Sequence, residues 1–182
     1  MRQRLREDAA AVVAALRQHG LALEILSGDR ADAVAPVAQA LGIADWRAGV
    51  TPAEKIAHIA DLQAAGRRVL MVGDGLNDAP ALAAASVSLS PVTAVHLTQA
   101  AADAVFLGDR LQPVIDALAI ARKAKRVMAE NLWLAVIYNL IAVPIAIAGL
   151  ATPLVAALAM SGSSVLVTAN ALRARRGREE MA

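Results

Sequence analysis

One long stretch without an ionisable side chain limits the possible folds more than any other feature of the sequence. Residues 132–172 include no Asp, Glu, Lys, Arg or His. The segment 149–153 divides this stretch into halves of about twenty residues, each able to cross a bilayer core about 30 Å thick as a helix. A soluble core could also bury such a hairpin, but a charge-free stretch of this length is costly to keep in water. We therefore predict a transmembrane hairpin with helices at about residues 132–150 and 153–172.

Basic residues flank the predicted hairpin on both sides, at residues 122–126 and 173–176. Lys and Arg are enriched on the cytoplasmic side of membrane proteins. We therefore expect both ends of the hairpin, and both chain termini, to be cytoplasmic. Basic runs also occur in nucleic-acid-binding proteins. No aromatic or glycine-rich partner accompanies these runs, so we expect no nucleic acid partner.

The residues before the hairpin alternate between strand-like and helix-like segments. Apolar strands are expected at residues 21–26 and 69–72, with further strands near 87–89 and 104–107. The segment 69–72 is wholly apolar, which is typical of a strand buried on both faces of a parallel sheet. The alternation predicts an α/β domain with helices covering a parallel sheet. The absence of cysteine excludes disulfides and thiolate metal sites.

A polar loop follows the apolar segment 69–72 directly and reads Gly-Asp-Gly-Leu-Asn-Asp. Ligands in parallel α/β sheets bind at the carboxyl ends of the strands. The loop presents two carboxylates there, Asp74 and Asp78, together with the amide of Asn77, and oxygen ligands of this kind suit Mg²⁺ beside a phosphate. A bare Gly-Asp-Gly is a common turn, but the whole run after a strand favours a magnesium and phosphate site.

Two further positions are ambiguous when each is taken alone. Ser27 follows the first strand, where its hydroxyl could donate to a phosphoryl oxygen or cap the next helix. Lys55 lies early in a helix that begins with a capping box and a proline at residues 51–54. Its ammonium could pair with a phosphate, or it could be a solvated surface lysine. Taken alone, each position favours the structural alternative.

Together, Ser27, Lys55 and the acidic pair resemble the last three motifs of the haloacid-dehalogenase (HAD) superfamily. Within it, the run Gly-Asp-Gly-x-Asn-Asp-Ala-Pro-Ala-Leu at residues 73–82 resembles the P-type ATPases, and Thr-Pro-Ala-Glu-Lys at residues 51–55 matches their Pro-x-x-Lys element. The resemblance covers nearly the whole chain. It implies a partial HAD-like (Rossmann-like) α/β fold followed by a two-helix transmembrane hairpin, in a bacterial inner membrane.

The resemblance also implies a division of the chain and a reaction. Residues 1–110 would be the C-terminal half of the phosphorylation domain, 111–131 a connecting helix, 132–172 the two membrane helices and 173–182 a basic cytoplasmic tail. The reaction would be aspartyl phosphorylation by ATP followed by hydrolysis, coupled to ion transport. In that cycle Asp74 would ligate Mg²⁺ with support from Asp78, Asn77 and Ser27 would hydrogen-bond the phosphoryl group, and Lys55 would neutralise its charge.

The sequence departs from the family pattern in what it lacks. It contains no Asp-Lys-Thr-Gly-Thr motif, no nucleotide-binding region and no earlier membrane helices. We therefore expect a C-terminal part of a pump that is inactive alone, with a missing N-terminal half as its partner. Its sheet should lack the strand that bears the phosphorylated aspartate, which would leave an edge exposed.

The hairpin contains four candidate ligands for a transported ion: Tyr138, Asn139, Met160 and Ser164. A thioether suits Cu(I), but small residues and Met are also common in plain helix packing. Tyr-Asn in the first helix, and Met-x-x-Ser-Ser followed by Asn-Ala-Leu-Arg in the second, resemble the copper-transporting P1B subgroup. That resemblance implicates all four residues in Cu(I) transport. Residues 90–91 and 98–107 further resemble the branch that supplies copper to cytochrome oxidase assembly.

The sequence suggests three alternative functions. The first is ATP-driven export of Cu(I) by a P-type ATPase of which this chain is a part. The second is a non-catalytic metal-binding fragment, or half of a split pump. The third is a membrane-anchored HAD phosphatase, which would need an Asp-x-Asp motif that the sequence does not show.

Overall fold

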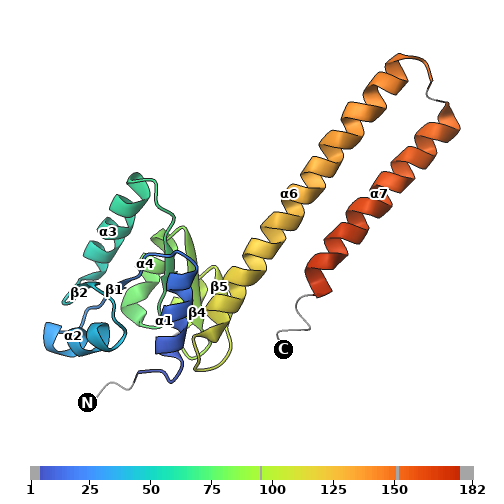
Figure 1. Ribbon diagram of the computed structural model, residues 1–182. Helices are drawn as coiled ribbons and strands as arrows, with labels where there is room; N and C mark the ends of the chain where they lie inside the picture. The colour runs from blue at the N-terminus through green and yellow to red at the C-terminus, as the bar shows by residue number, and fades with distance from the viewer. Residues whose placement is uncertain (1–4, 95, 151, 177–182) are drawn as a thin grey trace. The chain divides into compact units, whose positions relative to one another are not determined.

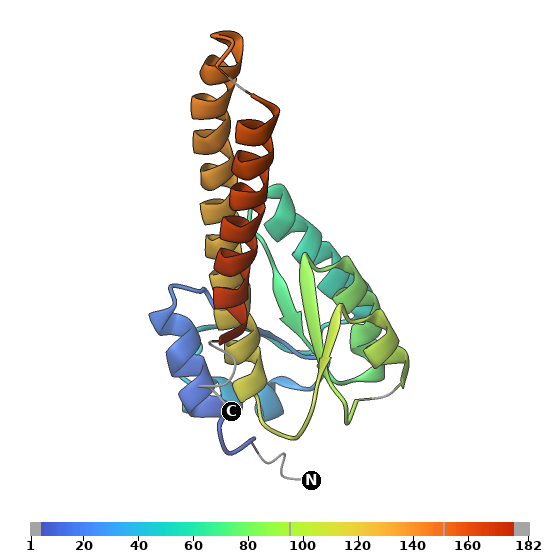
Figure 2. The same ribbon diagram turned by 90° about the vertical axis from the view of Figure 1, so that its right-hand side faces the viewer.

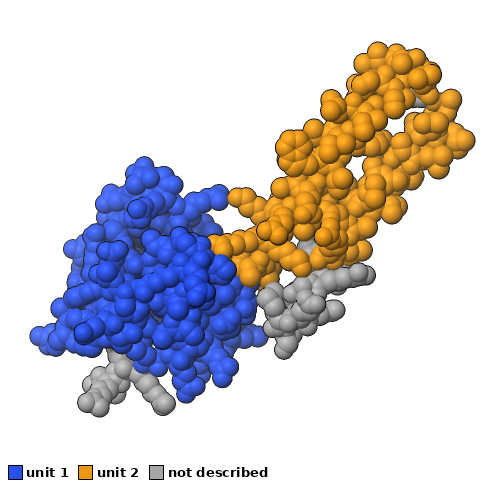
Figure 3. All heavy atoms as spheres, viewed as in Figure 1, with its two compact units in different colours: residues 1–116 blue, residues 117–182 orange. Residues whose placement is uncertain are grey.

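The computed structural model describes residues 5–94, 96–150 and 152–176. The chain divides into two compact units, residues 1–116 and 117–182, which Figure 3 shows in two colours.

The first unit alternates helices and strands, as the sequence predicts (Figure 1). Each strand in it is short and follows a helix or a turn. The elements are α1 (Ala9–Gln18), β1 (Glu24–Leu26), α2 (Ala31–Ala40), β2 (Asp45–Arg47), α3 (Pro52–Ala64), β3 (Leu70–Val72), the 3₁₀ turn η1 (Leu76–Asp78), α4 (Ala79–Ala84), β4 (Val87–Pro91), α5 (His96–Ala101) and β5 (Ala104–Phe106).

The strands form two separate parallel sheets. One has the order β1–β2 and the other the order β3–β4–β5. In the second sheet Met71 on β3 pairs with Ser88, and Ser90 on β4 pairs with Val105. Figure 2 shows these three strands between α1 (blue) on one side and α3 and α4 (teal to green) on the other. Parallel strands joined by crossover helices make this an α/β fold.

The core of the first unit centres on α4 and β4. Ala81 and Leu82 on α4 are fully buried, as are Ser88 and Ser90 on β4. Helix α3 packs against α4 and buries Ile59. The strand at the centre of the three-stranded sheet is therefore the buried one, because it has a neighbour on both edges.

The strand β3 is less buried than its apolar sequence predicts. Leu70 is 37% exposed and Val72 is 39% exposed, so the prediction of burial on both faces is wrong for these residues. Among the described strands, β3 pairs with β4 alone and forms the border of its sheet. No described strand pairs with the other edge of β3, so no neighbouring strand covers Leu70 and Val72 from that side. An open edge at β3 among the described strands agrees with the expectation of an exposed sheet edge, whereas the missing strand with the phosphorylated aspartate stays a prediction.

The second unit is built from two long helices, α6 (Gln112–Ile147) and α7 (Pro153–Arg176), the first of which begins within the first unit. Helix α6 is continuous over 36 residues, so the predicted connecting helix and the first predicted membrane helix are one element. Both helices are long and apolar enough to cross a membrane. The predicted borders of the membrane segments stay predictions.

The turn between the two helices has clear local causes. Gly149 adopts a φ of 72°, a conformation that glycine adopts without the steric cost of a side chain. Thr152 then caps α7, since its Oγ1 accepts a hydrogen bond from Val155 N at 3.3 Å. Pro153 is the first residue of the helix, where its missing N–H costs nothing.

Half-buried residues mark the faces that α6 and α7 turn toward each other. On α7 they are Ala159, Ser163, Val167 and Asn170, spaced by about one helical turn. Three of the four are small or polar, which allows two helices to approach closely in a membrane. The facing positions on α6 include Glu130, Asn131, Tyr138 and Ala142.

Candidate functional site

A buried ion pair joins two of the predicted site residues. Lys55 Nζ donates to Asp78 Oδ1 at 2.6 Å, and the two side chains are 6% and 18% exposed. A short charge-assisted bond of this kind is stronger than a neutral hydrogen bond. The alternative of a solvated surface lysine is therefore wrong for Lys55.

The capping box at the start of α3 places Lys55 on the buried face of that helix. Thr51 Oγ1 accepts from Glu54 N at 3.3 Å, while Glu54 Oε2 accepts from Thr51 N at 2.7 Å. The hydrogen bond from the Thr51 backbone, and then that from its side chain, lower the pKa of the Glu54 carboxyl. With the helix start fixed, Lys55 and Ile59 lie one turn apart and are both buried.

The loop after β3 wraps closely around the Asp78 carboxylate. Gly75 N donates to Asp78 Oδ2 at 3.3 Å. A Cβ at Gly73 would lie 3.0 Å from the Asp78 Cβ, and a Cβ at Gly75 would lie 3.1 Å from Asp78 Oδ2. The two glycines of the motif are therefore needed for close approach, because any side chain there would push the carboxylate away.

A buried threonine, for which the sequence predicts no role in the site, donates a hydrogen bond to the backbone of this loop. Thr98 on α5 is fully buried, and its Oγ1 donates to the carbonyl oxygen of Gly75 at 2.9 Å. Nothing in the sequence singles out this contact, since Thr98 lies 23 residues further along the chain. The hydroxyl satisfies a backbone oxygen that would otherwise be unpaired next to the core.

The other carboxylate of the motif, Asp74, is open to solvent. Its side chain is 64% exposed, and its Oδ2 lies 3.3 Å from Arg6 Nη2. Arg6 also donates to the Asp109 carbonyl oxygen at 3.1 Å. No motif in the sequence indicates this contact of Arg6, which lies 68 residues before Asp74 along the chain. Each acidic residue of the motif thus has one basic partner, and Asp74 keeps room for a further ligand.

Ser27 and Asn77 are not joined to the ion pair. Ser27 Oγ accepts from Asp29 N at 3.1 Å and donates to Asp29 Oδ2 at 3.4 Å. The cap position of α2 is held by Arg30, so the helix-cap alternative for Ser27 is wrong. Asn77 is exposed within η1. In the described part of the chain, no hydrogen bond links either residue to Lys55 or Asp78.

The carboxylates at the end of β3 are of the chemical type that binds a magnesium ion. Mg²⁺ is commonly held by one or two carboxylates together with phosphate oxygens and water. Asp74 and Asp78 supply two carboxylates, and no third acidic residue or histidine joins them within the described residues. Water and phosphate oxygens would supply the remaining ligands.

The four ligand candidates of the hairpin do not share one site: Met160 and Ser164 lie one turn apart on an exposed face of α7, and Tyr138 and Asn139 are adjacent on α6. Tyr138 is half-buried between α6 and α7, whereas Met160 is 70% exposed and Ser164 is also exposed. Asn139 donates to the Ala135 carbonyl oxygen of its own helix at 3.0 Å. None of the hydrogen bonds described for the hairpin joins two of these four residues. The hairpin alone does not bring them together.

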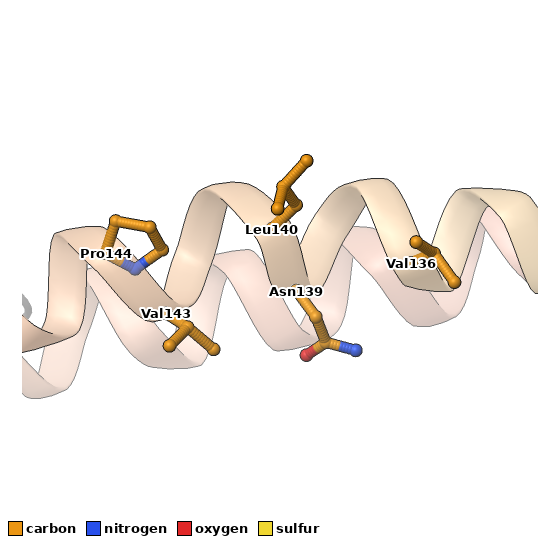
Figure 4. Close-up of a pocket in the computed structure, with 5 residues that line it drawn as sticks. All are labelled: Val136, Asn139, Leu140, Val143 and Pro144. Carbon is orange, nitrogen blue, oxygen red and sulfur yellow. The ribbon is translucent and has the colours of Figure 1, made fainter.

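Asn139 lines a shallow groove on α6 of about 460 Å³. Figure 4 shows its amide beside Val136, Leu140, Val143 and Pro144, and it is the polar side chain among these five. Pro144 has no N–H to bond the carbonyl of Leu140 one turn earlier. The groove therefore has one amide on an otherwise apolar surface, and the Leu140 carbonyl lacks its usual partner at position 144.

The chain is similar to known proteins over nearly its whole length. A family model described as haloacid dehalogenase-like hydrolase matches residues 1–86. The chain is 61% identical over 181 residues to "Nitrogen fixation protein FixI" of Bradyrhizobium diazoefficiens, covering 100% of this chain and 25% of that protein. It is 40% identical over 172 residues to "Probable copper-exporting P-type ATPase V" of Mycobacterium tuberculosis, covering 94% of this chain and 22% of that protein.

A solved structure matches both the α/β unit and the helices. The crystal structure of a zinc-transporting PIB-type ATPase in its E2·Pi state has a TM-score of 0.87 and 31% identity, covering 95% of this chain and 28% of that chain. The chain spans about a quarter of the length of the curated relatives it matches. On sequence and fold together, the chain is homologous to a C-terminal part of the metal-transporting P-type ATPases.

Proposed function

We propose that this chain completes the phosphorylation site of a copper-transporting P-type ATPase and supplies two helices of its membrane pathway. The whole protein would use ATP to export Cu(I) from the cytoplasm. The observation that carries this proposal is the buried Lys55–Asp78 pair at 2.6 Å, next to the exposed carboxylate of Asp74 at the end of a parallel strand. Two fixed charges and one open ligand are what phosphoryl transfer needs for positioning and charge stabilisation.

In this proposal each residue of the site has a separate role. Asp74 holds Mg²⁺, which neutralises charge on the transferred phosphoryl group when bound. Asp78 orients the Lys55 ammonium, and Lys55 faces the phosphoryl oxygens as a compact positive charge. Ser27 and Asn77 donate hydrogen bonds to the same oxygens once these approach. The exposed edge of β3 is where the strand that bears the phosphorylated aspartate would pair.

The choice of Cu(I) rests on the residues of the hairpin. Met160 offers a soft thioether, which suits Cu(I) better than a hard divalent cation. Residues 132–172 contain no ionised side chain that could offset a second positive charge. The solved relative transports zinc, but its ion is a property of that protein. Because the four ligand candidates do not share one site, further helices of the whole pump would complete the site.

A chimera tests the function. The matching segment of the copper-exporting M. tuberculosis relative is replaced by this chain, and the product is purified from membranes. We expect it to form a phosphoenzyme from ATP and to hydrolyse ATP faster when Cu(I) is added. The Lys55→Ala chimera should lose phosphoenzyme, whereas Lys125→Ala, at an exposed position of α6, should keep it.

Two results would contradict the proposal. A folded chimera without phosphoenzyme would remove the phosphorylation role from this chain. Stimulation by Zn²⁺ in place of Cu(I) would leave that role intact and overturn the choice of ion.

A further inference from the structure

The second unit contains a cavity where α6 and α7 lie side by side near their basic ends. Its volume is about 480 Å³. The residues that define its character are Arg126, Glu130, Trp133, Ile137, Asn170 and Arg173. None of them has a part in the function proposed above.

One end of the cavity is polar and carries an excess of positive charge. Asn170 Nδ2 donates to Glu130 Oε2 at 3.2 Å, and Arg173 Nη1 donates to Asn170 Oδ1 at 3.1 Å. Two guanidinium groups, from Arg126 and Arg173, thus line the cavity with a single carboxylate. Guanidinium groups bind phosphate with paired hydrogen bonds. This end of the cavity therefore suits a singly charged phosphate.

The other end of the cavity is apolar and runs into the charge-free segment. Trp133 and Ile137 follow Arg126 and Glu130 at successive turns of α6, and they are 66% and 50% exposed. Trp is the side chain typical of the boundary between lipid and water. The order along the helix is thus cation, polar network, indole and aliphatic side chain, which matches a molecule with an anionic head and an apolar tail.

We propose that this cavity binds one anionic phospholipid of the cytoplasmic leaflet, with its phosphate on Arg126 and Arg173 and an acyl chain along Trp133 and Ile137. Basic pockets between membrane helices on the cytoplasmic side are suited to such headgroups. Free phosphate would use the two arginines but would leave the apolar half of the cavity empty. The inference rests on the hairpin spanning the membrane and is independent of the transported ion.

Lipid selectivity of the full chain tests the inference. The chain is reconstituted into phosphatidylcholine bilayers containing phosphatidylglycerol, extracted in detergent, and its retained lipid is identified by native mass spectrometry. We expect one phosphatidylglycerol to be retained in preference to phosphatidylcholine. The double variant Arg126→Gln/Arg173→Gln should lower this preference about tenfold or more. The matched control Lys123→Gln/Lys125→Gln removes two charges outside the cavity and should keep it.

The outcomes separate the possible errors. Equal loss of selectivity in both double variants would show general surface charge and overturn the site. Displacement of phosphatidylglycerol by inorganic phosphate alone would show a small-anion site and overturn the lipid assignment. Removal of the chain from membranes by alkaline carbonate would overturn the membrane hairpin as well, whereas integral insertion without selectivity would overturn the lipid site alone.

Discussion

Lys55 and Asp78 show how a single ion pair joins two distant parts of the sequence. Removing one partner of a buried pair leaves an uncompensated charge, which costs about 3 kcal/mol of folding free energy. We therefore expect Lys55→Met and Asp78→Asn each to lower the urea midpoint of the full chain in detergent, followed by circular dichroism. The double variant should lose clearly less than the sum of the two losses. Additive losses would mean that the pair contributes no mutual stabilisation.

Glu54 gives a prediction about pH. Hydrogen bonds from Thr51 lower the pKa of this carboxyl below its ordinary value of 4.5. A group with a lowered folded pKa stabilises the fold above its unfolded pKa and loses that contribution as the pH falls through the folded pKa. We expect the protection of the first α3 amides from hydrogen exchange to decline below pH 4.5. In Glu54→Gln this part of the decline should be absent, and an unchanged pH profile would exclude a role for the carboxylate.

The site residues differ in how far sequence could place them. Asp74, Asp78 and Lys55 stand in a recognisable order, and the capping box fixes where α3 begins, so the sequence predicts all three as residues of one site. The direct Lys55–Asp78 ion pair was not predicted, because it depends on how α3 packs against the loop after β3. Arg6 and Thr98 could not be predicted in this way. Their contacts with Asp74 and Gly75 depend on long-range packing, and neither side chain stands in a motif.

Helices α6 and α7 are joined in the hairpin by a hydrogen bond between two asparagine side chains. Asn170 Nδ2 donates to Asn131 Oδ1 at 3.0 Å. The sequence has no cysteine, so a pair of cysteines introduced here reports on this contact alone. We expect the variant Asn131→Cys/Asn170→Cys to form an intramolecular disulfide on mild oxidation in membranes, seen as a mobility shift that a reductant reverses.

The control for this cross-link places the second cysteine on the outer face of α7. Ala171 is exposed, so Asn131→Cys/Ala171→Cys should stay reduced, because a disulfide needs its Cα atoms within about 7 Å. Equal cross-linking in both variants would mean that the helices do not keep this register.

Helix and strand positions followed from sequence more closely than burial did. Alternating apolar segments and turn residues predicted β1, β3, β4 and β5, since these depend on local chemistry, but the sequence does not predict the strand β2 (Asp45–Arg47). The exposure of Leu70 and Val72 could not be predicted from the composition of β3, because burial depends on a neighbouring strand. The sequence also predicts a helix that runs from about residue 111 into the charge-free stretch, and the continuity of α6 confirms it, because the change from basic to apolar residues near residue 132 does not interrupt a helix.

Each of the two units contains part of a proposed site: the first has part of a phosphorylation site, and the second has part of an ion-binding site. The first unit ends in a sheet with an open edge at β3 beside the charged loop. The second carries candidate ligands that do not share one site. Both features are those of a chain that covers about a quarter of its relatives' length. They favour a part of a larger pump over a self-sufficient metal-binding fragment.

This preference predicts that Met160 matters in the complete pump and not in the chain alone. Met160 is 70% exposed and has no partner ligand nearby among the described hydrogen bonds of the hairpin, so a single thioether should bind Cu(I) weakly. In competition with a Cu(I) chelator, the chain alone and its Met160→Leu variant should therefore bind equally. In the chimera, the same substitution should abolish stimulation of ATP hydrolysis by Cu(I), while Met128→Leu, outside the predicted membrane segment, should not. Tight Cu(I) binding by the chain alone that Met160→Leu removes would instead identify a metal-binding fragment, because the hairpin would then assemble the site without other helices.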